Sequence, residues 1–182
     1  MLFRSGAFRE AKALTQAALG HISAANVGSD RNVREMALQI HLACVVRESD
    51  SQSTVEIKDA FERAIEIGET LGERTALLEA YRGLTPYYAY VGNASQALRY
   101  ERLAVDAALK SANPIAITGA HQAAAFSSQL FERYTDALRY GREAQRYAAQ
   151  VTSRDDKRAS DILPSGWDSF SAVLLEIGRA HV

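Results

Sequence analysis

Cysteine, proline and tryptophan are scarce in this sequence, and its charges nearly cancel. Among 182 residues there are one cysteine, three prolines and one tryptophan, and the formal net charge is −1. The single cysteine, Cys44, excludes an internal disulfide and favours a reducing compartment. The balanced charge argues against a nucleic-acid-binding surface on this segment. No apolar run approaches the roughly 20 residues that a membrane helix needs, and the first residues lack the apolar core of a secretion signal, so we expect a cytoplasmic protein.

Motifs of the common catalytic chemistries are missing as well. The chain contains no Gly-x-Ser-x-Gly, no Walker phosphate loop and no His-Glu-x-x-His. His41 and Cys44 are three residues apart and would supply half of a zinc site, but zinc takes four ligands and a second pair is absent from the sequence. We therefore predict no enzyme activity, no metal and no cofactor. An enzyme with its chemistry around His41, Cys44 and His121 is the less favoured alternative.

The residues that are present suit one helical domain. Apolar residues make up 47% and charged residues 24% of the chain, which is enough to bury a core, and the length fits a single domain spanning 1–182. Residues 177–182 match the translation of a common sequencing adaptor, and we interpret them as a read-through remnant. We accordingly expect the chain to be a piece of a longer protein.

The sequence repeats itself with a period of forty residues. The tripeptide Leu-Arg-Tyr at 98–100 recurs at 138–140, and alanine recurs at Ala64, Ala104 and Ala144. A fixed period between twenty and fifty residues is typical of stacked repeats. The three alanines share one position of the repeat, so we predict that they are buried where helices meet.

Each period predicts two helices with a tight turn between them. Residues 77–91 carry apolar and aromatic side chains at helical spacing. Gly92 then offers a left-handed stop, and Asn93 with Gln96 has the capping-box spacing. Because the turn is short, the two helices must be antiparallel.

Similar signals mark the other helix starts. Asn113 precedes a proline at the first helical position, and Asn32 and Ser53 each precede a glutamate by three residues. Together these signals predict helices near 6–25, 31–49, 53–71, 74–92, 94–111, 114–132 and 134–151.

The paired helices resemble the tetratricopeptide repeat. Tyr81, Leu84 and Tyr88 match the signature of its first helix, helix A, and Ala97 and Ala104 match that of its second, helix B. The resemblance implies an all-α, right-handed superhelix, an α-solenoid of antiparallel helix pairs with about three full repeats and partial ones. The forty-residue period is similar to the long variant found in large bacterial signalling ATPases and winged-helix transcriptional regulators. HEAT-type repeats are the second choice, because the alanine signature is not theirs.

Two positions depart from the tetratricopeptide pattern. Thr85 stands where glycine is usual, and Glu101 stands where an aromatic residue is expected. His41, Tyr81 and His121 occupy one position at intervals of forty, where the family packs an aromatic side chain between helices, and we predict packing roles for all three.

By resemblance, the chain is a protein- or ligand-binding module, the sensor or interaction segment of a larger bacterial regulator or signalling ATPase. A freestanding adaptor is the alternative. The resemblance implies that a protein, a peptide or a small effector binds in a groove lined by helix A, without direct nucleic-acid or membrane contact. The implied groove residues are Gln39, Leu42, Val46, Glu79, Arg82, Tyr90, Gln122, Phe126 and Gln129.

Arg82 is the strongest candidate in this groove, because its fork of donors suits a carboxylate or phosphate. The alternative for Arg82 is a salt bridge to Glu79, three residues back. Pro86, inside the same predicted helix, lies beside a cluster of tyrosines at 87, 88 and 90. It predicts either a kink that serves packing or a widened groove with tyrosines at its lip.

Overall fold

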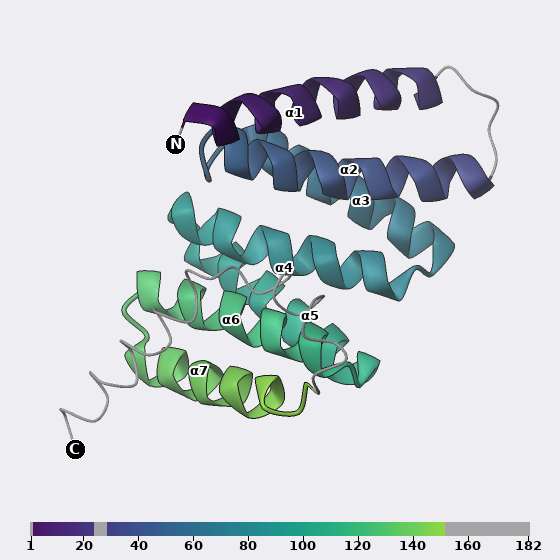
Figure 1. Ribbon diagram of the computed structural model, residues 1–182. Coiled ribbons are helices and arrows are strands. Elements are labelled where there is room, and N and C mark those ends of the chain that lie inside the picture. Colours follow the sequence, from purple (N-terminus) through teal and green to yellow (C-terminus); the bar gives the residue numbers. More distant parts are fainter. Residues whose placement is uncertain (1, 24–28, 152–182) are drawn as a thin grey trace.

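The computed structural model describes residues 2–23 and 29–151, and every regular element in those ranges is an α-helix (Figure 1). The predicted helices are all present and differ from the structure only at their ends. The adaptor-like residues 177–182 lie outside the described ranges. The helices are α1 (Leu2–Ser23), α2 (Ser29–Ser49), α3 (Val55–Leu71), α4 (Arg74–Tyr90), α5 (Ala94–Ser111), α6 (Pro114–Leu130) and α7 (Tyr134–Ala148).

The helices stack in chain order, each antiparallel to the one before it (Figure 1). Helix α4 also contacts α2 and α6, its next-but-one neighbours. Among the described residues, no comparably extensive contact joins α3 to α5 or α5 to α7. The array thus has an A layer, made of α2, α4 and α6, and a B layer, made of α3, α5 and α7. None of the described helices is long and apolar enough to cross a membrane.

The turns follow a spacing of twenty residues. Gly72, Gly92, Ala112 and Glu132 all have positive φ, between 52° and 74°. After three of these residues the next amide donates to a carbonyl five residues back, at 2.8–2.9 Å, which closes the end of the preceding helix. The left-handed stop predicted at Gly92 is confirmed. Two of the four positions carry side chains that disfavour this backbone conformation.

Two predicted helix caps are confirmed. The side chain of Asn93 accepts a hydrogen bond from the amide of Gln96 at 3.1 Å, and Asn113 accepts from the amide of Ile115 at 3.0 Å. Each bond satisfies a donor that the first helical turn leaves without a partner.

The two earlier cap predictions are wrong. Asn32 lies inside α2, which begins at Ser29. Ser53 lies ahead of the start of α3, and Thr54 directly precedes the helix without capping it. The hydroxyl of Thr54 donates to the carbonyl of Ser51 at 2.8 Å instead, and so it stabilises the turn rather than the helix.

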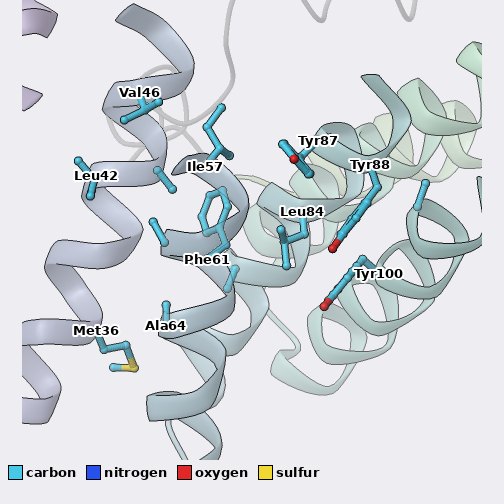
Figure 2. Packing of buried hydrophobic residues seen from close by; sticks show 14 of the residues in the cluster. Met36, Leu42, Val46, Ile57, Phe61, Ala64, Leu84, Tyr87, Tyr88 and Tyr100 are labelled. Atoms are coloured by element: carbon cyan, nitrogen blue, oxygen red, sulfur yellow. The ribbon is translucent and has the colours of Figure 1, made fainter. Parts of the chain in front are cut away.

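The alanines that recur every forty residues are all buried. Ala64, Ala104 and Ala144 have exposed fractions of 0%, 1% and 3%, which confirms the predicted packing positions. Figure 2 shows Phe61 and Ala64 of α3 between α2 and the rest of the core. Burial of the same positions in α3, α5 and α7 is what gives the three B-layer helices a common orientation.

Helix α2 is offset by one residue from the forty-residue period that relates α4 to α6. It ends 41 residues before α4 ends, whereas α4 ends 40 residues before α6. The turn between α2 and α3 comprises residues 50–54, and the corresponding turn after α4 comprises only 91–93. Leu42 and Val46 therefore take buried positions in the core cluster.

The same offset explains three residues predicted to pack alike. Tyr81 packs on Tyr100 at 6.1 Å between ring centroids, and His121 packs on Tyr140 at 5.8 Å. His41, in contrast, is exposed, so the predicted packing role of His41 is wrong. The longer turn before α3 rotates its side chain out of the equivalent position.

Candidate binding face on α4 and α6

The predicted groove residues separate into two sets. Leu42 and Val46, with exposed fractions of 7% and 0%, offer no surface to a partner, and Gln39 is partly exposed on α2. The remaining six are accessible and come from two neighbouring helices of the A layer. This α4–α6 face comprises Glu79, Arg82, Tyr90, Gln122, Phe126 and Gln129.

Arg82 links the two helices of this face. Its Nη2 atom donates to a carboxylate oxygen of Glu79, one turn back on α4. On the other side the guanidinium lies directly over Gly119 of α6, because a Cβ added there would lie 2.6 Å from Nη1 of Arg82. The absence of a side chain at Gly119 is therefore what lets the arginine cross to α6. The side chain remains 28% exposed, so water and ligands reach it.

An aromatic pair forms the other end of the face. The rings of Tyr90 and Phe126 lie 5.2 Å apart with a tilted geometry. Tyr90 is 46% exposed. Its neighbours Tyr87 and Tyr88 are instead buried, and the hydroxyl of Tyr88 donates to Glu62 of α3 at 2.9 Å. Of the tyrosines at 87, 88 and 90, only Tyr90 belongs to the α4–α6 face.

Pro86 lies between the two ends without breaking the helix. Helix α4 runs through it to Tyr90, and the proline is buried. A proline removes one helical amide donor and leaves the carbonyl of Arg82 without its usual partner.

Cys44 on α2 lies within the electrostatic reach of this polar end. Burial raises the pKa of the Cys44 thiol, while the charges of Arg47 and Arg82 oppose that rise. A thiol whose pKa is raised is mostly protonated at neutral pH and is a poor nucleophile. The position therefore suits packing better than covalent chemistry.

The histidines of the alternative enzyme site are not brought together. His121 is buried on α6, where its Nδ1 atom lies 2.8 Å from the carbonyl of Ile117 and its ring stacks on Tyr147 at 6.0 Å. Burial lowers the pKa of His121 below its ordinary value. His41 and Cys44 lie on α2, which α4 separates from α6. In the part of the chain that the structure describes, no three His, Cys, Asp or Glu residues are grouped to hold a metal ion.

A buried ion pair between α5 and the turn that precedes α7 was not predicted from the sequence. Glu101 on α5 is 1% exposed, and its Oε2 atom accepts from Nη2 of Arg133 at 2.6 Å. Its other oxygen, Oε1, has no hydrogen-bond partner, and neither have the hydroxyls of Ser127 and Ser128 nor the Oε1 atom of Gln129. The sequence signal for this pair was Glu101 itself, which stands forty residues after the buried Phe61. A carboxylate at a buried position requires a partner.

Comparisons with protein-family models, with curated proteins and with solved structures found no match to this chain.

Proposed function

We propose that this chain is a non-catalytic binding module that takes a peptide segment of a protein partner on the α4–α6 face. The observation that carries the proposal is Arg82, an accessible guanidinium held across Gly119 by the shape of α6. An arginine that is already positioned loses little side-chain freedom when it binds a carboxylate or phosphate.

The array supports this as a tetratricopeptide-type superhelix with the A layer on its inside. Helices of the A layer contact one another more closely than those of the B layer, and a stack closes toward its more tightly spaced layer. The α4–α6 face then lies on the concave side, where extended binding surfaces of repeat proteins form. By the resemblance described above, the module is the sensor or interaction segment of a larger bacterial regulator or signalling ATPase.

The two ends of the face define what a ligand needs. Arg82 and Tyr90 are eight residues apart on one helix, a separation of about 12 Å. An extended peptide covers that distance with about four residues. The matching ligand therefore carries a carboxylate and an aromatic or large aliphatic side chain about four residues apart.

A panel of fluorescent peptides with that spacing tests the proposal by anisotropy. We expect Arg82→Ala to weaken binding by about 2 kcal/mol, or about 30-fold, with an unchanged melting temperature. Arg102→Ala, a matched deletion on the exposed face of α5, should leave binding unchanged. Equal losses in both variants, or normal binding by Arg82→Ala, would contradict the proposal.

Gly119→Ala provides an independent perturbation of the same arginine. The added methyl group collides with the end of a flexible side chain, so the guanidinium must move while the helix remains intact. We expect weaker peptide binding in the wild-type background and no further loss in the Arg82→Ala background. Additive losses would show that the position of Arg82 over α6 is irrelevant to binding.

A further inference from the structure

The exposed side of the B layer carries opposite charges at its two ends. Helix α3 has five carboxylates against two basic residues, whereas α7 has three arginines against two carboxylates. Equivalent positions of the two helices also carry opposite charges. At three places eighty residues apart, an acid on α3 corresponds to an arginine on α7: Asp59 and Arg139, Glu62 and Arg142, and Glu66 and Arg146.

These side chains form one stripe on each helix. Asp59 and Glu66 are exposed, and Glu62 between them is partly exposed. Spacings of three and four residues place all three on one helical face. The arginines of α7 have identical spacing and all three are exposed. Because the two helices share the burial frame of the repeat, the stripes point to the same side of the molecule.

Local counter-ions only partly neutralise the stripes. Arg139 donates to Asp136 at 2.9 Å and Arg146 lies 2.8 Å from Glu143. Arg142 forms no ion pair with any residue that the structure describes. On α3, Lys58 lies 3.2 Å from Asp59 and 3.9 Å from Glu62, and Arg63 lies 3.1 Å from Glu66. Glu62 also accepts the hydrogen bond from Tyr88 of α4. The excess of carboxylates on α3 remains.

We propose that the exposed side of the B layer docks a second copy of this chain, in a weak two-fold dimer that pairs the acidic stripe of α3 with the arginine stripe of α7. A two-fold axis parallel to α5 brings α3 of each copy onto α7 of the other. The facing helices then run in the same direction, so each of the three acids meets its own arginine twice in the dimer. An axis perpendicular to α5 would place α3 against α3, with like charges opposed.

The available area agrees with a dimer of this kind. Three helices of 15 to 18 residues, each about 10 Å wide, present at most about 750 Å² per copy. Because the B layer is the outer, convex layer of the proposed superhelix, the buried area is smaller than this maximum and lies below the roughly 800 Å² per partner of a standard interface. Charged contacts contribute more to orientation than to affinity, so the dimer is weak and dissociates in salt. On the central helix this axis places each residue opposite its own copy, so Arg102 faces Arg102 and α5 adds no pair of opposite charges.

The test is a charge swap followed by sedimentation equilibrium of the full chain at about 0.1 M and about 1 M NaCl. The Debye length falls from about 10 Å to about 3 Å between these concentrations, so wild-type dimer should be lost at high salt. Arg139→Glu/Arg146→Glu and Asp59→Arg/Glu66→Arg should each self-associate at least about tenfold more weakly at low salt. An equimolar mixture of the two variants should recover the dimer, because both stripes again face opposite charges.

Recovery of the dimer in the mixture shows that both variants are folded, because two misfolded chains would not form a dimer when mixed. A wild-type chain that stays monomeric at low salt at about 0.5 mM overturns the proposal. Loss of dimer in both variants without recovery in the mixture also overturns it. As a further arm, polyglutamate that binds a monomeric wild-type chain through Arg139 and Arg146 would assign the arginine stripe to an acidic partner instead of a second copy.

Discussion

Phe61, Leu84 and Tyr87 fill the junction where α3 meets α4 (Figure 2). Forty residues later, where α5 meets α6, the equivalent positions hold Glu101, Ala124 and Ser127. Large apolar side chains in the first junction thus correspond to small or polar ones in the second. Both junctions nevertheless keep helices of 17 or 18 residues, a turn residue of positive φ and a buried alanine.

The comparison separates the positions that determine the backbone arrangement from the positions whose side chains only fill the space between helices. Alanine at 64, 104 and 144 lets neighbouring helices approach, and the residues of positive φ at 72, 92, 112 and 132 reverse the chain. The residues that fill the space between the helices differ widely in size and polarity, as the change from Phe61 to Glu101 and from Leu84 to Ala124 shows. Gly83, against which Phe61 packs, is replaced by Ala123 in the second junction, where no aromatic ring needs the space.

Because burial of apolar area is the main stabilising contribution, the two junctions differ in strength. In the first, Phe61 is 1% and Leu84 0% exposed. In the second, a carboxylate and two hydroxyls are buried with unpartnered oxygens, and each such atom costs roughly 1–3 kcal/mol. We therefore expect α6 and α7 to open more readily than α3 and α4.

The largest expected effect is that of Phe61→Ala. Removing this ring should cost about 3–5 kcal/mol, since it deletes a buried aromatic side chain and leaves a cavity. Tyr134→Ala, an aromatic deletion at a 56% exposed position, should change the unfolding free energy by less than about 0.5 kcal/mol. Urea denaturation measures both. Similar costs for the two variants would show that the first junction is not held by its apolar filling.

Arg133→Ala should cost about 2–3 kcal/mol by the same measurement. It leaves the carboxylate of Glu101 buried without a counter-charge, and the cost falls below the full range for a broken buried pair because Arg133 is 28% exposed. Replacing both residues by leucine should return the stability to near wild type. A neutral Arg133→Ala would mean that the pair does not hold the second junction.

Exchanging the turn residues should have a smaller effect. Glu132→Gly should stabilise the chain, and Gly92→Glu should destabilise it, each by up to about 1 kcal/mol, because only glycine adopts positive φ without strain. Glu132→Ala removes the charge but keeps the strain, so it should not reproduce the gain. Thermal unfolding of the three variants distinguishes backbone strain from the loss of a carboxylate.

Mild acid should destabilise the contact between α6 and α7, where His121 packs on Tyr140 and Tyr147. Burial lowers the pKa of His121 in the folded chain, whereas the unfolded chain keeps an ordinary pKa of about 6.5. As pH falls below about 6.5 the unfolded state binds the proton first, so this part of the stability is lost on going from neutral to acidic pH. His121→Tyr, which copies Tyr81 of the preceding unit, should reduce the pH dependence. An unchanged pH profile would contradict this role.

Much of the helical framework could be predicted from the sequence because its signals are local. Helical periodicity, Gly92 and the caps at Asn93 and Asn113 depend on residues within one or two turns of each other. The prediction was wrong where the connection lengthens at residues 50–54, since the one-residue offset of α2 places Leu42 and Val46 in the core. A prediction that applies the forty-residue period equally to every helix cannot reveal that shift of α2.

The candidate binding face was predicted in part. Arg82 and Glu79 are three residues apart in the sequence, so their ion pair could be anticipated. Contact of Arg82 with Gly119 depends on the stacking of two repeats, and the pairing of Glu101 with Arg133 joins positions that do not share a place in the repeat. Contacts of that kind follow from packing and leave no periodic signal.

Native-state hydrogen exchange tests the central comparison most directly. With increasing low concentrations of denaturant, the amides of α6 and α7 should exchange through an opening of lower free energy than those of α3 and α4. The Arg133→Ala variant should lower the opening free energy of α6 and α7 further and leave α3 and α4 nearly unchanged. A single opening free energy for all four helices, or earlier opening of α3 and α4, would contradict the account.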